Sequence, residues 1–348
     1  MNVDPHYYNK DRLFSYRAYL NFSISERGLG KTTCAKMWAI DDFLKTGKRF
    51  VWVRRYQTEL TGDKKAKIEG CVKTFFKKVQ KFYKDVKFEI KANHAYINGK
   101  DAGVFVALST SENMKGTDFP DVNKIIFDEF IIIKTKAMTY LSNEMTVFLD
   151  LVSTVFRPSE RTEQERKNDK IWLLANAITF ANEYFYYFNI KPFKGQYYHD
   201  KNRGIVVEQC KNELYRESVR KSRFGKLVSG TPYENYAIDN NYLLDREDFI
   251  GKKSPLADFI FNVRYEGQRW GIYADMYNVY VTFKCEPNAL FYTFTKKDHS
   301  LDSVLLKNAR DTQFEMLVRN YQLGLVKCEN IMIYNKFVDF MKLFIVKW

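Results

Sequence analysis

Short apolar runs alternate with helical patterns over the first ~200 residues of the chain, as in α/β proteins. The apolar runs predict buried strands over residues 19–25, 49–54, 102–108, 124–128 and 171–176. Two further runs, 87–91 and 95–97, predict a hairpin, and the chain is expected to turn near Asn98-Gly99 into the strand over 102–108. Helical spacing predicts helices over 32–45, 64–84 and 144–156. We therefore expect a parallel sheet with flanking helices.

The pattern changes near residue 210. A basic helix is expected over 211–226, followed by a turn-rich stretch that we interpret as a linker. Short strands then follow at 258–265, 270–274, 277–283 and 289–295, and helices at 301–320 and 330–346. We divide the chain into a first domain over 1–210, a basic helical linker over 211–246 and a smaller α+β domain over 247–348.

Composition narrows the class of protein and of partner. The chain has 348 residues, with 45% hydrophobic and 28% charged residues, as in a globular protein. Its net charge of +14 favours an anionic partner, and nucleic acid is the commonest one. The alternative is compositional drift, since AT-rich genomes encode much Lys, Asn, Ile, Phe and Tyr.

Cysteine usage and hydropathy exclude other classes. The five cysteines are scattered without a C-x-x-C pair, and the four histidines do not cluster with them, so neither a zinc site nor a disulfide framework is expected. No run approaches the ~20 apolar residues of a membrane span, and the first residues lack the pattern of a signal peptide. We expect a protein of a reducing cytoplasm without a membrane partner.

A phosphate-binding loop is predicted where the first strand meets the first helix. The stretch follows the pattern G-x-x-x-x-G-K-[ST], except that Ser25 replaces the first glycine. Lys31 can reach the β- and γ-phosphates, and the Thr32 hydroxyl can ligate Mg²⁺. The candidate nucleotide-binding residues are Ser25, Glu26, Arg27, Gly28, Leu29, Gly30, Lys31, Thr32 and Thr33.

Acidic and polar residues end the later strands of the predicted sheet. Asp128 is expected to hold Mg²⁺ together with Thr32, and Glu129 to orient and deprotonate the attacking water. Asn176 ends another apolar strand and is placed to sense the γ-phosphate, or else caps a helix.

Basic residues supply the remaining candidates. Arg157 and Lys115 are candidates for contact with the nucleotide of a neighbouring subunit. Arg54 and Arg55 end a strand at the same sheet edge and are interpreted as nucleotide or DNA contacts. The basic helices over 64–84 and 211–226 are candidate DNA contacts, or simply solvated faces. The aromatic run 181–188 is interpreted as core, with an adenine-stacking wall as the alternative.

These segments occur together in a recognisable order. The segments are Ser25-Glu-Arg-Gly-Leu-Gly-Lys-Thr32, Phe50-Val-Trp-Val-Arg-Arg-Tyr56, Ile125-Ile-Phe-Asp-Glu-Phe130, Asp150-Leu-Val-Ser-Thr-Val-Phe-Arg157, Leu174-Ala-Asn-Ala177 and Ser222-Arg-Phe-Gly-Lys-Leu-Val-Ser-Gly-Thr231. In combination they resemble the DNA-packaging ATPases of φ29-like tailed phages. The resemblance covers most of the chain and is strongest over 19–235.

The resemblance implies a fold, an activity and a setting. Members are P-loop NTPases of the additional-strand, conserved-Glu (ASCE) type, related to large terminases. They form a homopentameric ring on the portal of an empty prohead and use ATP and Mg²⁺ to pull double-stranded DNA inward. The setting implied is the host cytoplasm, transiently the portal vertex, and not the mature virion. Some relatives dock on a structural RNA, which adds RNA as a candidate partner.

The resemblance also implies residue roles. Lys31 and Thr32 match the phosphate-loop pair, and Asp128 and Glu129 match the metal-binding and catalytic acids. Arg157 matches a trans-acting arginine finger, and Lys115 falls near a second trans-acting basic position.

The smaller domain resembles an RNase H-like terminase nuclease. Its acids are dispersed and suggest no two-metal cluster, so we expect the nuclease activity to be lost: Asp258, Glu266, Asp275, Glu286 and Asp298.

Two alternatives stay open. One is a terminase with an active C-terminal nuclease. The other is a non-catalytic portal- or nucleic-acid-binding module with a vestigial nucleotide site, for which Ser25 is the support. A host-type helicase fits the second domain less well.

Overall fold

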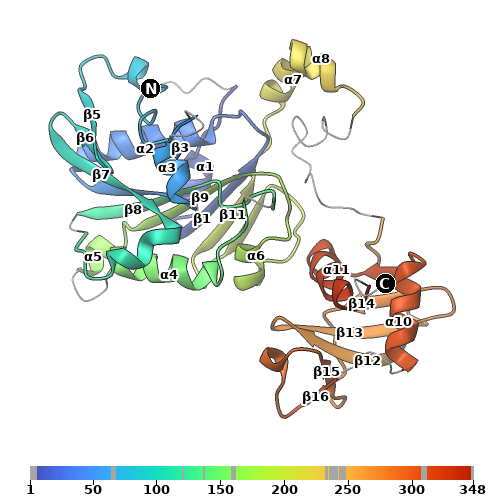
Figure 1. Ribbon diagram of the computed structural model, residues 1–348. Helices are drawn as coiled ribbons and strands as arrows, with labels where there is room; N and C mark the ends of the chain where they lie inside the picture. The colour runs from blue at the N-terminus through green and yellow to red at the C-terminus, as the bar shows by residue number, and fades with distance from the viewer. Residues whose placement is uncertain are drawn as a thin grey trace. The chain divides into compact units, whose positions relative to one another are not determined.

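The chain forms two compact units in the computed structural model, which describes residues 6–63, 68–119, 121–135, 138–157, 162–231, 234, 242, 248–306 and 312–345 (Figure 1). The first unit comprises Met1–Thr179 and Phe193–Leu243, and the second comprises Phe180–Pro192 and Leu244–Trp348. The second unit thus includes a short segment from the middle of the chain. The domain boundaries drawn from the sequence stay predictions, and most of the turn-rich stretch after residue 231 lies outside the described residues.

A nine-stranded sheet in the order β10-β11-β1-β9-β8-β2-β7-β6-β5 forms the centre of the first unit. Its strands are β1 (Leu20–Ser25), β2 (Arg49–Arg54), β5 (Phe88–Lys91), β6 (His94–Ile97), β7 (Lys100–Ala107), β8 (Val122–Asp128), β9 (Lys170–Asn176), β10 (Tyr197–Asp200) and β11 (Ile205–Gln209). The strands from β11 to β7 pair in parallel, and β10, β6 and β5 add at the two sides in antiparallel fashion. The predicted α/β fold is confirmed.

The strand order decides where the polar ends of the strands meet. β9 lies between β1, which leads into the phosphate-binding loop, and β8, which carries the acids. This additional strand is the feature expected of the ASCE type. Because parallel strands end at one edge of a sheet, Ser25, Arg54, Asp128 and Asn176 lie along the same edge.

Helices cover both faces of this sheet (Figure 1). The helices of the first unit are α1 (Asp11–Ser15), α2 (Lys31–Thr46), α3 (Gln57–Thr61), α4 (Glu144–Val155), α5 (Glu163–Arg166), α7 (Glu213–Lys221) and α8 (Arg223–Val228), with the 3₁₀ turns η1 (Gln80–Phe82) and η2 (Leu108–Met114) and the small strands β3 (Gly62–Asp63) and β4 (Ile68–Glu69). α2 buries Ala35, Ala39 and Phe43, which recur every four residues on one side of the helix. Left-handed glycines, Gly30 and Gly47, bound this helix.

The helix predicted over 64–84 is wrong for the described part of that segment. Residues 71–79 form successive turns that lead into η1. Their backbone N–H groups bond mostly to the third preceding residue, as in Phe75 N–H to Val72 O (3.1 Å) and Val79 N–H to Phe76 O (3.0 Å). The apolar spacing that predicted a helix instead buries these side chains through 3₁₀-type turns. The basic helix predicted over 211–226 is likewise divided, because Ser222 caps α8 and interrupts the helix.

The second unit holds a six-stranded sheet in the order β16-β15-β12-β13-β14-β17. Its elements are α6 (Glu183–Tyr187), β12 (Asp258–Tyr265), β13 (Gln268–Ala274), β14 (Val279–Thr282), β15 (Phe291–Thr293), η4 (Lys296–Asp298), β16 (Ser303–Leu305), α10 (Thr312–Gln322), β17 (Val326–Cys328) and α11 (Ile331–Ile345). β12, β13 and β14 form an antiparallel meander, to which β15, β16 and β17 add in parallel. The predicted α+β character is confirmed, but residues 303–305 form a strand where a helix was expected.

Aromatic packing joins the parts of the second unit. Trp270 of the sheet meets Phe337 and Phe340 of α11 with ring centroids 6.0 Å apart in both cases. α6 is attached to α11 by a hydrogen bond of 2.7 Å from the Tyr186 hydroxyl to Met332 O. Tyr184 and Phe185 of the aromatic run are buried, as the core interpretation expects, whereas Tyr187 is exposed. Among the helices that the structure describes, none is both long and apolar enough to cross a lipid bilayer.

Replacement of Phe75 by Ala tests the turn segment. Phe75 is fully buried, with ring centroids 4.9 Å from those of Trp52 and Phe105. We expect Phe75→Ala to lower the free energy of unfolding by about 3–5 kcal/mol, the usual cost of emptying an aromatic core site. Denaturant unfolding followed by tryptophan fluorescence measures this. Phe82→Ala is the control, since Phe82 is 42% exposed and its loss should cost well under 1 kcal/mol. Equal losses in both variants would contradict the packing described.

Candidate active site

The loop between β1 and α2 has the backbone of a phosphate cradle. Gly28 and Gly30 have φ angles of 90° and 100°, which favour glycine over residues with a side chain. Leu29 is buried, and its carbonyl accepts a hydrogen bond of 3.0 Å from Tyr8 N–H. Gly28 and Arg27 are exposed at the loop surface. The loop is thus anchored in its middle, and the N-terminus of α2 that follows it offers unpaired N–H groups to an anion.

Lys31 is buried at the start of α2, and its hydrogen-bond acceptors among the described residues are neutral oxygens. Its Nζ donates to Ser25 Oγ, to Glu26 O (3.4 Å) and to Asn176 Oδ1 (3.4 Å). Burial lowers the pKa of Lys31. A buried ammonium with neutral partners favours an incoming anion, so the residues fit a triphosphate. Ser25, the departure from the motif, supplies one of these acceptors, and Asn176 is brought to the loop as predicted.

Two oxygen ligands for a divalent cation lie side by side. Thr32 Oγ1 donates to Asp128 Oδ1 at 3.0 Å, although the two residues are 96 positions apart in the chain. Asp128 is buried, and burial raises its pKa while nearby Arg54 acts in the opposite direction. Hydroxyl and carboxylate oxygens are ligands that Mg²⁺ accepts, so this pair fits the predicted metal site.

Arg54 binds the acids at the end of β8, a role that the sequence interpretation did not give it. Its guanidinium lies 2.7 Å from Glu59 Oε1, 3.2 Å from Asp128 Oδ2 and 2.7 Å from Glu129 Oε2. Burial by itself would lower the pKa of Arg54, but the carboxylates raise it further than burial lowers it. Arg54 is therefore an internal counter-ion of the site.

Glu129 leaves the sheet in an unusual backbone conformation. Its φ of 64° is rare for a residue with a side chain, and its N–H donates to Leu174 O at 2.8 Å. The side chain is 49% exposed, in contrast to that of Asp128. The sharp turn directs successive acids into different surroundings: Asp128 faces Thr32, and Glu129 is open to water. Strained backbone of this kind is common at functional sites.

Arg55 follows β2 directly and is fully buried. It forms a bidentate pair with Glu144, the first residue of α4, with both contacts at 2.8 Å. Its Nη1 and Nη2 also donate to Glu129 O (3.2 Å) and Phe130 O (2.7 Å). The interpretation of Arg55 as a nucleotide or DNA contact is wrong, because its donors are enclosed in the protein. It holds the segment that carries Glu129.

Arg157 and Lys115 lie along α4, away from the phosphate-binding loop. Arg157 follows the C-terminal end of α4 and pairs with Asp118 at 3.4 Å, and Lys115 pairs with Asp150 of α4 at 3.3 Å. The twelve residues of α4 span about 18 Å. Arg55 connects Glu144, the first residue of α4, to the Glu129 segment. Arg157 therefore lies at the opposite end of α4 from that segment. The ion pairs of the described residues thus hold Lys115 and Arg157 along α4.

The Thr32 hydroxyl provides a direct test of the metal site. We expect Thr32→Val, which removes that hydroxyl with little change of shape, to abolish most of the gain in nucleotide affinity that Mg²⁺ gives. Thr32→Ser keeps the oxygen and should keep that gain. Titration of each variant with a fluorescent nucleotide, with Mg²⁺ or with excess chelator, measures the effect. An undiminished Mg²⁺ effect in Thr32→Val would exclude Thr32 as a ligand.

Comparison with known proteins agrees with this geometry. The family model of the podovirus DNA encapsidation protein (Gp16) matches residues 3–345. The DNA packaging protein of Bacillus phage phi29 is 32% identical over 333 residues, which cover 94% of this chain and 95% of that protein.

Solved structures agree as well. A chain of the bacteriophage phi29 genome packaging motor assembly superimposes with a TM-score of 0.77 at 30% identity, covering 97% of this chain and 99% of that one. The N-terminal domain of the phi29 DNA packaging ATPase matches 59% of this chain and 97% of its own length, with a TM-score of 0.51 and 34% identity. The chain belongs to the podovirus DNA encapsidation protein (Gp16) family.

Proposed function

We propose that this protein is the ATPase of a genome-packaging motor, which hydrolyses ATP to move double-stranded DNA through a portal into a prohead. Family membership supports the packaging role, and relatives are named as a DNA packaging protein and a DNA packaging ATPase. The observation that carries the catalytic part is the meeting of Lys31, Thr32, Asp128 and Asn176 at one sheet edge. This set fits the triphosphate of ATP and its metal ion.

The site residues divide the chemistry among themselves. Lys31 and the loop N–H groups bind the β- and γ-phosphates, and Asn176 contacts the γ-phosphate beside them. Thr32 and Asp128 would hold Mg²⁺, which would supply positive charge to the phosphate oxygens. Glu129, half exposed beside Asp128, orients the attacking water and accepts its proton. Glu26, Arg27, Leu29 and Thr33 shape the loop.

Arg157 and Lys115 act in trans in this proposal. The length of α4 separates Arg157 from the acids of its own chain, while its position at the end of that helix lets it reach another molecule. An arginine finger from a neighbour requires a ring, for which we propose a homopentamer. Such a finger stabilises the charge of the transition state.

The proposed partners follow from charge and family. A net charge of +14 suits contacts with the DNA phosphate backbone, which carry no sequence information and weaken with salt. The portal protein of the prohead is the second partner, and a structural RNA is a candidate third. We propose that the protein acts in the host cytoplasm and at the portal vertex, and leaves before the mature virion forms.

We propose that the second unit has an RNase H-like fold without nuclease activity. Its meander β12-β13-β14, extended in parallel by β15 and β16 on the β12 side, supports this assignment. Its acids are engaged separately: Glu266 pairs with Lys336 at 2.8 Å, while Asp275 accepts bonds from Tyr277 N–H and Asn278 N–H, both at 2.8 Å. No group of three potential metal ligands occurs within the described residues. Nicking of plasmid DNA by the purified protein with Mn²⁺ would favour the active-nuclease alternative.

Replacement of Glu129 tests the catalytic assignment. We expect Glu129→Gln to lower DNA-stimulated ATP hydrolysis by at least about 100-fold, the usual contribution of a general base, while nucleotide affinity stays within a few fold of wild type. Steady-state hydrolysis with and without double-stranded DNA measures the first, and fluorescent-nucleotide titration the second. Hydrolysis that survives in Glu129→Gln would assign the base elsewhere. A wild type that binds but never hydrolyses ATP on its assembled portal would favour the non-catalytic module.

Mixing of inactive subunits tests whether Arg157 acts in trans. Arg157→Ala should lose about 1,000-fold or more in hydrolysis if it supplies the finger. In a mixture with Glu129→Gln subunits, some interfaces join an intact Glu129 to an intact Arg157 from the neighbour. We therefore expect the mixture to regain hydrolysis that neither protein shows alone. Mixing Arg157→Ala with Lys31→Ala is a second complementing pair. A finger that acts in cis would give no recovery in either mixture.

A further inference from the structure

An acidic side chain is buried inside the phosphate-binding loop. Glu26 is fully buried, between Ser25 and the exposed Arg27. Its Oε1 accepts a hydrogen bond of 3.2 Å from Arg216 Nε, while its Oε2 has no hydrogen-bond partner among the described residues. A loop that binds an anionic ligand thus contains a negative charge of its own. None of the catalytic steps proposed above uses the Glu26 carboxylate.

Arg216 is positioned to compensate for this charge. It lies on α7, is buried apart from 8% of its surface, and is separated from Glu26 by 190 positions in the chain. Its Nη1 donates to Glu213 at 2.7 Å, so one arginine connects the loop acid to the first turn of α7. Burying an ionised carboxylate is costly unless a cation pairs with it. Arg216 is that cation.

A second residue of α7 contacts the same loop. The Tyr215 hydroxyl donates to Arg27 O at 3.0 Å. It also lies against Gly28, where an added Cβ would collide with it. Consecutive residues of one helix therefore hold consecutive residues of the loop. The absence of a side chain at Gly28, which suits the loop to phosphates, also leaves space for the Tyr215 hydroxyl.

The groups that face Glu26 come from several elements. Arg216 and Tyr215 belong to α7, Lys31 to α2, and Cys210 follows β11. Burial raises the pKa of Glu26, and Arg216 and Lys31 oppose this rise. Lys31 is also the residue that must meet the nucleotide. Without Arg216, Glu26 would therefore depend on Lys31 for its counter-charge and would repel the phosphates.

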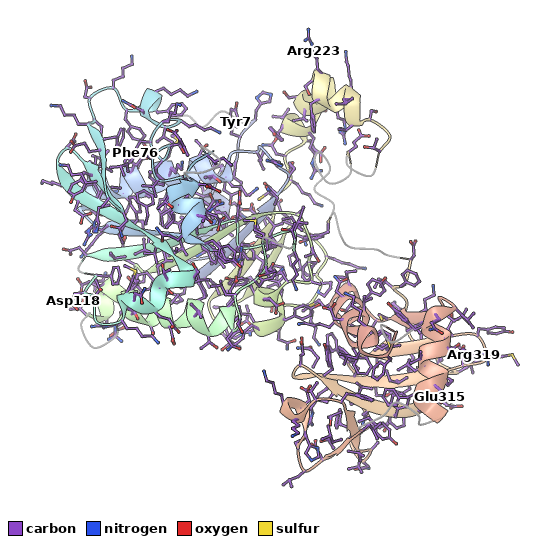
Figure 2. All side chains as sticks on the ribbon, in the orientation of Figure 1. Tyr7, Phe76, Asp118, Arg223, Glu315 and Arg319 are labelled. Atoms are coloured by element: carbon purple, nitrogen blue, oxygen red, sulfur yellow. The ribbon has the colours of Figure 1, made fainter. Side chains whose placement is uncertain are left out.

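We propose that Arg216 is a positioning residue of the nucleotide site: it neutralises Glu26 and, with Tyr215, fixes the phosphate-binding loop to α7. The inference rests on the proposed function in that it takes the loop to bind a nucleotide. Nucleotide affinity then depends on Arg216, although Arg216 itself contacts no phosphate. α7 is followed directly by α8, whose exposed Arg223 points away from the protein in Figure 2.

Binding of a fluorescent ADP analogue to the full chain tests this inference. We expect Arg216→Met, which keeps the aliphatic stem and removes the charge, to weaken binding by about tenfold or more at about pH 8. The double variant Glu26→Gln/Arg216→Met removes both charges and should regain affinity within about threefold of wild type. Arg220→Met, on the exposed side of α7, is the matched control and should bind as wild type does.

The pH profile separates charge compensation from a loss of packing. Without Arg216 the pKa of Glu26 rises further, and protonation at lower pH removes the repulsion. The ratio of the Arg216→Met to the wild-type dissociation constant should therefore fall toward one as the pH is lowered. Taking the ratio at each pH cancels the titration of the ligand. A role in packing alone would leave the ratio constant.

Further outcomes decide the inference in each case. Arg216→Lys keeps a charge near Glu26 and should bind within about threefold of wild type, whereas a role confined to the arginine fork would weaken it like Arg216→Met. If Arg216→Met fails to fold, the double variant and Arg216→Lys still test the proposal, since both should fold and bind. Wild-type affinity in Arg216→Met, or no rescue in the double variant, would overturn it. A wild type that binds ADP but hydrolyses no ATP would overturn the proposed function alone.

Discussion

The site depends on a buried ammonium group whose hydrogen-bond acceptors, among the described residues, are neutral oxygens. Lysine is seldom enclosed without an anion, because removing its charge from water is costly. Lys31 receives only partial compensation from Ser25, the loop backbone and Asn176. The surrounding architecture maintains this state: β9 is inserted beside β1 and brings Asn176, and the glycines of the loop leave its N–H groups accessible. The carboxylates of Asp128 and Glu26 act on the Lys31 charge without accepting a hydrogen bond from it, and a bound triphosphate would place negative charge in direct contact with the ammonium.

Two consecutive arginines at the end of β2 hold the acids of the site and the backbone that carries them. Arg54 is the last residue of β2, and Arg55 follows the strand directly. Arg54 binds the carboxylates, and Arg55 binds the carbonyls of Glu129 and Phe130 and the first residue of α4. The first contact balances charge near water, whereas the second is enclosed. Arg54 thus contacts the half-exposed carboxylate of Glu129, and Arg55 supports the backbone that carries it.

Local patterns in the sequence were sufficient for most of the first unit. Apolar runs that end in polar residues located β1, β8 and β9, and the loop motif located Lys31 and Thr32, because these signals lie within a few consecutive residues. Residues 71–79 were misassigned because the same apolar spacing serves a helix and a series of 3₁₀ turns. The roles of Arg54 and Arg55, and the pairing of Glu26 with Arg216, depend on partners tens to hundreds of positions away. Such contacts leave no periodic trace in a single sequence.

The placement of α6 has a mechanical consequence. The backbone passes between the two units at three points, 179/180, 192/193 and 243/244, so three chain connections join the second unit to the first. The first of these points lies only a few peptide bonds beyond Asn176, and α6 is secured in the second unit by the bond from Tyr186 to Met332. A force applied to the second unit would therefore be transmitted through a short length of main chain to Asn176, which accepts a hydrogen bond from Lys31.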